Sequence, residues 1–287
     1  MRRILFSSGA AVLFVVLLFA ATLLWGSLPA LRRFGLGFLT GRVWDPVSRT
    51  FGVMPFVVGT LVTSFLALLF ALLFSLAVAI LTGFYLGEGR VREVLVCASD
   101  LFAGVPSVVY GFWGLYFLVP LMRRIEVFLG VPPYGVGILT ASLVLSLMVA
   151  PYICSVSREA ISMVPGELVE AGFALGATRW EVVRGVVLPH ARSGIAAGVL
   201  LALGRALGET MAVTMVVGNS SEIPKSLFQP ANTLASVIAN EFTEATADIH
   251  LSALVGAGLV LMFMVTVVNI LGMWVVKRLG GGHGKAC

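Results

Sequence analysis

Six long apolar runs constrain the fold of this chain more than any other feature. They cover approximately residues 4–26, 56–86, 98–120, 135–156, 194–217 and 251–276. A helix needs about 20 apolar residues to cross a bilayer, and each run is long enough. None shows the alternation of a barrel strand, so each run can satisfy its backbone hydrogen bonds in lipid only as a helix. The sequence therefore predicts an all-α, polytopic membrane protein with six transmembrane helices.

The composition excludes a soluble protein. Charged residues make up 11% of the 287 residues and hydrophobic residues 59%, whereas a soluble domain carries about 25% charged residues. The mean hydropathy is +1.03. The net charge is +5, but the basic residues fall mostly in short loops between the apolar runs, as orientation in a membrane requires. We expect membrane lipid around the chain and no nucleic-acid partner.

The first run, which follows Arg2 and Arg3, is longer than a signal-peptide core, and Leu28 interrupts the small-residue pattern before Ala30. We therefore expect it to be retained as a helix. Six spans place both termini on one side, and a cytoplasmic location for the termini gives 11 Lys and Arg inside against 7 outside, with Arg205 within a span. This bias predicts cytoplasmic termini in the inner membrane, although the first outer loop, with four Arg, opposes it. The inside set is Arg2, Arg3, Arg90, Arg92, Arg158, Arg179, Arg184, Arg192, Lys277, Arg278 and Lys285, and the outside set is Arg32, Arg33, Arg42, Arg49, Arg123, Arg124 and Lys225.

The chain divides into three parts by this topology. Residues 1–55 form an N-terminal transmembrane helix and an outer loop, residues 56–277 form a transmembrane domain, and residues 278–287 form a cytoplasmic tail. Within the domain, residues 157–193 form a long inner loop. No repeat or low-complexity tract interrupts this division.

Motifs of enzymes and of metal sites are missing from the sequence. Cys97, Cys154 and Cys287 have neither metal-ligand nor redox spacing. The glycine-rich tail at 280–286 lacks the first glycine, the final hydroxyl and the preceding strand of a phosphate-binding loop. We therefore expect no catalytic residue, no metal and no cofactor. If ATP drives this protein, another chain binds it.

One segment of the inner loop carries a spaced motif. It reads Glu170-Ala171-Gly172, three residues, Gly176, nine residues, then Val186-Val187-Leu188-Pro189. Pro165 suits a helix start and Gly176 a helix stop, so a short helix with a face of small residues is predicted between them. Such a helix fits deep into a groove on another protein. The alternative is a surface helix without a partner.

The motif resembles the EAA motif of ABC importer permeases, with Gly172 where alanine is usual and Val186 where isoleucine is usual. The resemblance implies that this helix is the coupling helix, which docks on an ATPase. The residues that it assigns to ATPase coupling are Glu170, Ala171, Gly172, Gly176, Leu188 and Pro189.

Further stretches resemble the C-type permeases of phosphate-specific ABC importers, over about residues 40–277. This resemblance implies an all-helical, type I importer permease that forms half of a translocation path. It also implies a second related permease, two ATPase subunits and a periplasmic phosphate-binding protein as partners. The stretches are 44–46, 59–61, 103–111, 204–214, 217–219 and 223–242.

Arg205 and Glu209 are the candidate path residues of the fifth run. Insertion of an arginine at the middle of a span costs about 2.5–3.5 kcal/mol, so such a residue usually faces a water-filled path or a partner charge. Glu209, at i+4, is expected on the same helix face as an ion-pair partner. The guanidinium fork suits phosphate, and Glu209 could accept a proton of phosphate and would repel fully ionised sulfate. Alternatively, the two charges only neutralise each other or lock two helices together.

Gly104, Pro106 and Ser107 interrupt the third run. Pro106 removes a backbone hydrogen bond and frees a carbonyl. The three residues either line the path or form a packing kink.

Other functions remain open at this point. The cargo could be another oxyanion, namely sulfate, molybdate or phosphonate, because an arginine fits any of them. A secondary transporter or channel has no use for a coupling motif. An enzyme acting within the membrane would need a catalytic motif, and none is found.

Overall fold

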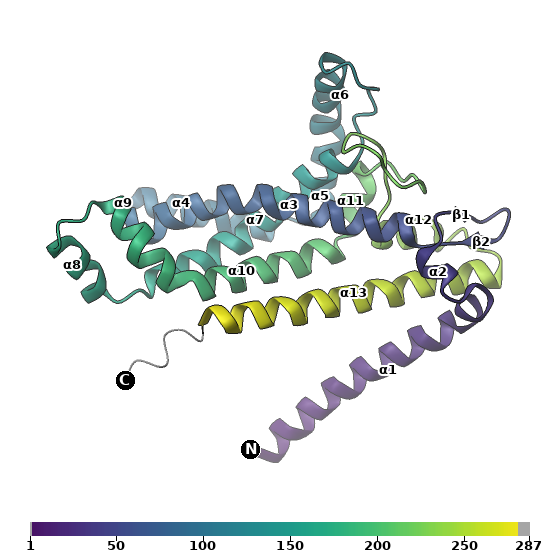
Figure 1. Cartoon of the computed structure of the whole chain (residues 1–287), viewed down its shortest axis with the longest axis horizontal. Coiled ribbons are helices and arrows are strands. Elements are labelled where there is room, and N and C mark those ends of the chain that lie inside the picture. Colours follow the sequence, from purple (N-terminus) through teal and green to yellow (C-terminus); the bar gives the residue numbers. More distant parts are fainter. Residues whose placement is uncertain (1, 281–287) are drawn as a thin grey trace.

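The computed structural model confirms the all-α fold (Figure 1). It describes residues 2–280, with side chains from residue 6 onward. In this part of the chain, five helical stretches are long and apolar enough to span a membrane, and one bent pair of helices makes a sixth candidate. The five stretches are built on α1 (Arg2–Phe34), α3 (Met54–Ile80), α7 (Ile138–Ser162), α10 (Leu188–Gly208) and α13 (Asp248–Gly280).

The third predicted span is not straight. Helix α4 (Arg90–Gly104) stops before Pro106, and α5 (Ser107–Trp113) restarts at an angle of 95°. Val105 has the extended backbone (φ −69°, ψ 129°) that a following proline favours. From α5 the chain continues through the π-helix η2 (Gly114–Leu118) into α6 (Val119–Phe128), which rises out of the bundle in Figure 1.

The fifth span begins and ends earlier than predicted. It covers Arg179–Gly208 instead of 194–217. Its first turns carry the exposed Arg184 and Arg192. Because these residues interrupt the apolar run, a prediction based on hydropathy places the start of the helix too late. Helix α11 (Met211–Val216) is separate. The predicted loop 157–193 is therefore largely helical. Residues 281–287, with Cys287 and most of the glycine-rich tail, lie outside the described residues.

Helix α7 is the centre of the bundle. In its most apolar window 67% of the residues are buried, against 6% in the window of α1. Val144, Leu145 and Met148 of α7 pack in one cluster with buried residues of α3, α10 and α11. Helix α1, by contrast, touches α13 near its outer end, where the Ala30 amide donates to Ser252 Oγ at 3.0 Å, and then diverges from the bundle (Figure 1).

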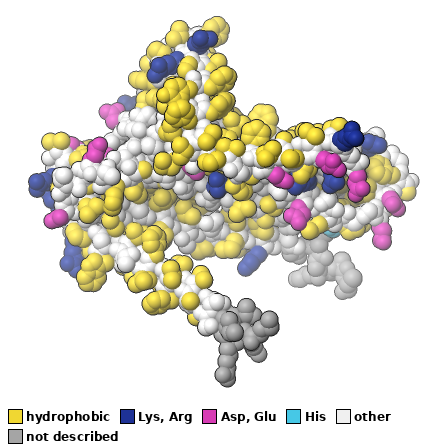
Figure 2. All heavy atoms as spheres, turned by 180° about the vertical axis from the view of Figure 1, so that it is seen from behind, with side chains coloured by type: hydrophobic (Ala, Val, Ile, Leu, Met, Phe, Trp, Pro, Cys, Tyr) yellow, Lys and Arg dark blue, Asp and Glu magenta, His cyan; other side chains and the backbone are white. Residues whose placement is uncertain are grey.

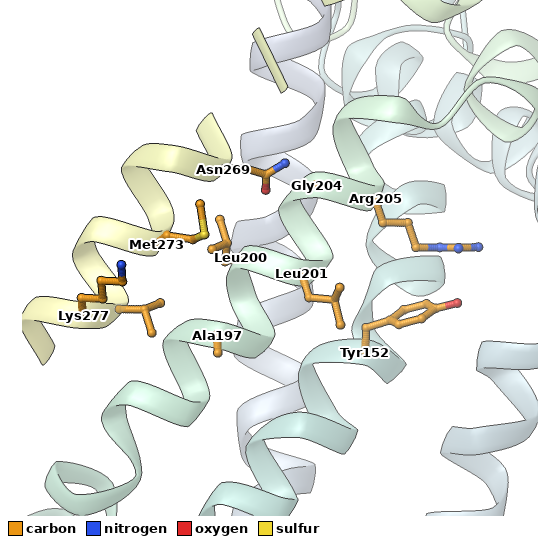
Figure 3. A pocket seen from close by; sticks show the side chains of 10 residues that line it. Tyr152, Ala197, Leu200, Leu201, Gly204, Arg205, Asn269, Met273 and Lys277 are labelled. Carbon is orange, nitrogen blue, oxygen red and sulfur yellow. The ribbon is translucent and has the colours of Figure 1, made fainter. Parts of the chain in front are cut away.

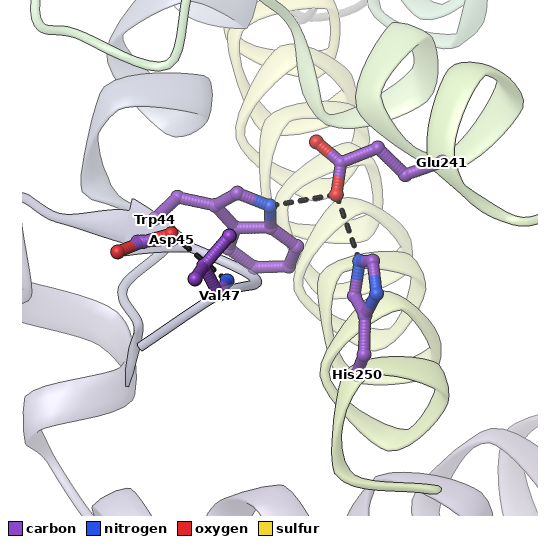
Figure 4. A network of polar contacts seen from close by, with 5 residues as sticks. All are labelled: Trp44, Asp45, Val47, Glu241 and His250. Carbon is purple, nitrogen blue, oxygen red and sulfur yellow. Dashed lines mark hydrogen bonds and ion pairs between the residues drawn. The ribbon is translucent and has the colours of Figure 1, made fainter. Parts of the chain in front are cut away.

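The predicted outer end is closed by short elements: α2 (Gly37–Thr40), an antiparallel pair of strands, β1 (Trp44–Asp45) and β2 (Thr50–Phe51), and α12 (Leu234–Glu241). Glu241 Oε2 of α12 joins β1 and the long helix α13, because it accepts hydrogen bonds from Trp44 Nε1 at 2.9 Å and His250 Nε2 at 2.8 Å (Figure 4). In the strand turn, hydrogen bonds from Ser48 and the Val47 amide hold the pKa of Asp45 below its usual value. This network fastens the strands to the start of α13.

The predicted inner end lies at the opposite end of the bundle and consists of helical turns (Figure 1). Helix α3 ends there in the π-helix η1 (Leu81–Tyr85). Helix α8 (Gly166–Ala174) and α9 (Arg179–Val182) follow α7, and the π-helix η3 (Val183–Val187) leads into α10. We name residues 166–182 the docking hairpin.

The surface agrees with a membrane protein. Hydrophobic side chains cover much of the face in Figure 2, and charged side chains gather mainly toward the two ends and the tip of the α6 arm. Exposed apolar residues such as Phe14 and Trp25 of α1 would face lipid. The chain is thus a multi-span membrane protein.

Candidate functional site

Arg205 lies in the last turn of α10 and is exposed on the surface of this chain. Its Cζ atom lies 4.8 Å from the centroid of the Tyr152 ring of α7, and both side chains point the same way from their helices in Figure 3. A guanidinium over an aromatic face gains a cation–π attraction. The contact holds the charge and leaves the edge of the guanidinium open.

The break in the third span lies beside this arginine. Pro106 has no amide hydrogen, so it cannot donate to Phe102 as a continuing helix would. The Tyr110 hydroxyl donates to the Phe102 carbonyl instead, at 2.7 Å. The Tyr152 hydroxyl lies 3.5 Å from the neighbouring Ala103 carbonyl. The broken backbone, the two tyrosines and Arg205 therefore form one polar region in otherwise apolar helices.

Gly104 and Ser107 stand on either side of the break. Gly104 is exposed, and a Cβ atom added to it would meet no atom within 4 Å. Ser107 is half-buried and is the first residue of α5. Within this chain Gly104 is therefore not required by packing, and the side of the break that it occupies stays open.

The predicted Arg205–Glu209 ion pair is wrong. Helix α10 ends at Gly208, and the extended ψ of Glu209 (φ −70°, ψ 126°) turns the following chain back toward its carboxylate. Glu209 Oε1 accepts instead from the Ala212 amide at 3.2 Å, at the start of α11. The carboxylate–base contact found among the described side chains joins His250 and Glu241. Arg205 is thus free to meet an external anion.

A groove of about 670 Å³ runs beside Arg205, between α10 and α13. Lys277 lies at its inner end and Asn269 faces it from α13 (Figure 3). Most of its other lining is apolar. The residues around it are Tyr152, Ala197, Leu200, Leu201, Gly204, Arg205, Asn269, Met273, Val276 and Lys277.

The docking hairpin has the local structure that its sequence predicts. Pro165 precedes α8, and Gly176 follows it with φ +84°, a conformation that only glycine adopts easily. Gly172 faces the chain itself, because an added Cβ would lie 3.1 Å from Val182 Cγ2. The small residue at 172 therefore serves the packing of α8 on α9, not a groove on a partner.

The remaining motif residues separate into two groups. Glu170 and Ala171 are exposed on α8, beside the exposed apolar side chains of Phe173 and Leu175. Leu188 and Pro189 instead form the first turn of α10. The residues of the motif thus lie in two places, on the exposed surface of the docking hairpin and at the start of α10, the helix that carries Arg205.

Two residues of this region escaped the sequence analysis. Tyr110 and Tyr152 look like ordinary residues of apolar spans, and only the tertiary contacts bring them to the break and to Arg205. A weak signal existed for Tyr110, since it follows Pro106 by four residues and its ring carries a donor. No such spacing points to Tyr152.

Comparison with known proteins identifies a family to which the sequence is similar. The family described as "Binding-protein-dependent transport system inner membrane component" matches residues 22–281. Relatives named "Phosphate transport system permease protein PstC" include that of Mesorhizobium japonicum, 41% identical and covering 96% of this chain and 89% of the relative. That of Haemophilus influenzae is also 41% identical, over 95% of this chain and 92% of the relative.

Solved structures share the fold. A bacterial alginate ABC transporter aligns with a TM-score of 0.67, 17% identity and coverage of 96% of this chain and 94% of that chain. The MetNI methionine ABC transporter, in an inward-facing conformation, aligns with a TM-score of 0.64, 18% identity and coverage of 83% and 99%. The predicted ABC importer permease fold is confirmed.

Proposed function

Since the chain belongs to the family of binding-protein-dependent transport system inner membrane components, we propose that it is the permease subunit of an ABC importer that carries inorganic phosphate. The observation that carries this proposal is the 41% identity, over nearly the whole chain, to permeases named for phosphate transport. The unpaired Arg205 beside the broken third span supports it.

The proposed chemistry at Arg205 is transient anion binding. A guanidinium stays charged at every physiological pH and offers two parallel N–H groups to two oxygens of phosphate. The Tyr152 ring shields one face of the guanidinium, so the anion meets its edge. A single arginine offers few hydrogen bonds to the anion and can therefore release it, as a path requires. Gly104, Pro106 and Ser107 are proposed to line the same region.

Glu209 has a different proposed part. Its carboxylate is engaged with the Ala212 amide, so it no longer counts as the neutralising partner of Arg205. We propose that it orients α11 beside the path. As a second role, we propose that the Glu209 carboxylate accepts a hydrogen bond from a protonated oxygen of phosphate.

The docking hairpin is the proposed contact with an ATPase. Its exposed face combines acidic and apolar side chains, namely Glu167, Glu170, Leu168 and Phe173. The sequence has no phosphate-binding loop of its own, so ATP is proposed to bind to a separate chain. In the proposed assembly, two such ATPases serve this chain and a second related permease, and a periplasmic phosphate-binding protein delivers the anion. The termini and the hairpin are proposed to lie in the cytoplasm.

The test is uptake of radioactive phosphate by the reconstituted complex in lipid vesicles. Each charge-assisted hydrogen bond to a charged group contributes about 1.5–3 kcal/mol, so Arg205→Gln should lower uptake by roughly tenfold or more. Arg205→Lys should retain little activity, because an ammonium lacks the planar fork. Glu209→Gln should have a milder effect, and adding it to Arg205→Gln should not restore uptake.

The controls in this experiment are assembly and ATP hydrolysis, which the Arg205 variants should keep. Uptake by Arg205→Gln within twofold of the parent would reject the path assignment. Rescue of uptake in the double variant would instead favour the alternative that Arg205 and Glu209 serve only to neutralise each other. If unlabelled sulfate, molybdate or phosphonate competes at the concentrations at which unlabelled phosphate competes, the cargo is not phosphate alone, and the proposed specificity is wrong.

A further inference from the structure

The connection between the docking hairpin and α10 is a π-helix. In η3 the Leu188 amide donates to the Val183 carbonyl, five residues back, instead of four. The next residue is Pro189, which has no amide hydrogen. Single π-turns inside α-helices are rare and occur often at functional sites. We name residues Val183–Val187 the π-joint.

Proline explains the π-turn. A proline within a helix removes one hydrogen bond, and its ring collides with the carbonyl four residues earlier. One extra residue in the preceding turn moves that carbonyl aside. The same arrangement occurs in η2, where the Val119 amide donates to the Gly114 carbonyl directly before Pro120. Pro189 therefore favours the π-joint, and packing contributes as well, because Pro151 lies inside α7 without a π-turn.

The chain before the π-joint is held as one unit. Thr178 and Glu181 form a capping box at α9, with Glu181 Oε2 2.7 Å from the Thr178 amide nitrogen. The Ala177 amide donates to the Gly172 carbonyl at 3.2 Å, and Gly172 lies against Val182. These contacts tie α8 to α9, so we expect the docking hairpin to move as a unit.

The chain after the π-joint is regular α-helix as far as Gly208. Arg205 lies 16 residues beyond Pro189, which is about 24 Å along the helix. Within the π-joint, Gly185 is exposed and has open space around it. Val187 and Ala191 belong to the buried cluster that includes Ala79 of α3 and Ile161 of α7, so part of the buried side of the joint consists of small side chains. Small side chains allow packed helices to slide.

We propose that the π-joint is the hinge at which the docking hairpin and α10 change their relative orientation, with Gly185 and Pro189 as positioning residues for coupling. This inference rests on the proposed function, because it takes the hairpin as the ATPase contact. It assigns Pro189 a role in transmission and none in docking. A displacement of the docking hairpin is then transmitted to Arg205 along α10.

The first test removes the hinge and keeps the orientation. Deleting Gly185 together with Pro189→Ala takes out the extra residue and the proline, so Arg179–Gly208 can form one uninterrupted α-helix with both ends still in phase. The complete complex is purified and reconstituted. We expect the variant to retain the ATPase subunits and to hydrolyse ATP within twofold of the parent, while phosphate uptake falls at least tenfold. Uptake within twofold of the parent would overturn the proposal.

The second test leaves the joint intact and therefore does not depend on the folding of a variant. Spin labels on Arg179→Cys and Leu201→Cys report the hairpin relative to α10, in a background without the three native cysteines. Their distance should differ between the nucleotide-free and the ATP-trapped complex. A reference pair inside the hairpin, Glu167→Cys and Arg179→Cys, should keep one distance. A constant 179–201 distance would also overturn the proposal.

The same experiment separates this inference from the proposed function. If the unaltered chain does not co-purify with an ATPase, the proposed function fails. If it does co-purify and transports phosphate, but the 179–201 distance stays constant, the hinge alone fails.

Discussion

Single side chains repair the break in the third span. Pro106 leaves the Phe102 carbonyl without the amide donor of a continuing α-helix, and the Val105 amide reaches that carbonyl only at 3.4 Å. The Tyr110 hydroxyl fills that gap from one helical turn beyond the break. A proline in a span is thus tolerated because one side chain replaces the missing amide.

This repair predicts that Tyr110→Phe destabilises the protein. Tyr110 is 6% exposed, and without its hydroxyl the Phe102 carbonyl keeps only the contact with the Val105 amide at 3.4 Å, so we expect a loss of about 0.5–1.5 kcal/mol in the free energy of unfolding. Thermal unfolding of the purified protein measures the loss. The matched control is Tyr116→Phe, because Tyr116 is 68% exposed. Equal stability of the two variants would contradict the repair.

Among the elements, the docking hairpin depends on glycine for two different reasons. Gly172 has little space for a side chain, since an added Cβ would lie 3.1 Å from Val182 Cγ2. Gly176 has open space around it but a left-handed backbone, φ +84°. An identical substitution at the two positions therefore fails by crowding at one and by conformation at the other.

We predict that Gly176→Ala weakens ATPase binding. A side chain in the left-handed conformation costs about 1–2 kcal/mol, which corresponds to roughly a 5- to 30-fold loss of affinity if the hairpin must keep its shape. Gly176→Trp should uncouple or disassemble the complex while the subunit stays inserted. The control is Gly87→Ala, an exposed inner-loop glycine with open space around it. Full ATPase and transport activity with tryptophan at 176 would reject the docking assignment.

At the outer end, the carboxylate of Glu241 is shared by donors from two other elements. Glu241 of α12 accepts from Trp44 of β1 and His250 of α13 (Figure 4), and His250 also stacks on Phe51 of β2 at 5.2 Å. Because the three elements are far apart in the sequence, this network sets the position of the strands against the bundle.

Replacing this carboxylate should loosen the outer end. Glu241→Gln removes the charge that both donors share, and we expect the free energy of unfolding to fall by about 1–3 kcal/mol. Denaturant unfolding of the purified protein checks it, with Glu244→Gln at an exposed neighbouring position as the control. The network has no stabilising role if both variants unfold at the same denaturant concentration.

At the scale of the whole molecule, the prediction concerns topology. The docking hairpin and the β1–β2 strands lie at opposite ends of the bundle (Figure 1). We expect fusions of an alkaline-phosphatase-type reporter to be active after residues near 40 and 235 and silent near 172. Activity of the fusion near 172 would reverse the orientation and exclude the hairpin from the cytoplasm.

The amino-acid sequence was enough to predict an all-α protein with several membrane spans and the local structure of the docking hairpin. These follow from local chemistry. Apolar runs of bilayer length have no stable alternative to a helix in lipid, and a proline and a glycine mark the two ends of α8 wherever it packs. The family-like motifs added the ABC permease fold.

The contacts of Arg205, the 95° bend and the length of the fifth span became visible in the folded structure alone. Sequence spacing placed Glu209 beside Arg205, but α10 ends at Gly208 and the Glu209 carboxylate accepts from the Ala212 amide of the next helix instead. Helix ends, π-turns and the choice of Tyr152 as neighbour depend on packing between elements that are distant in the chain. No local pattern specifies such packing, because the same apolar span can present any of its faces to the bundle.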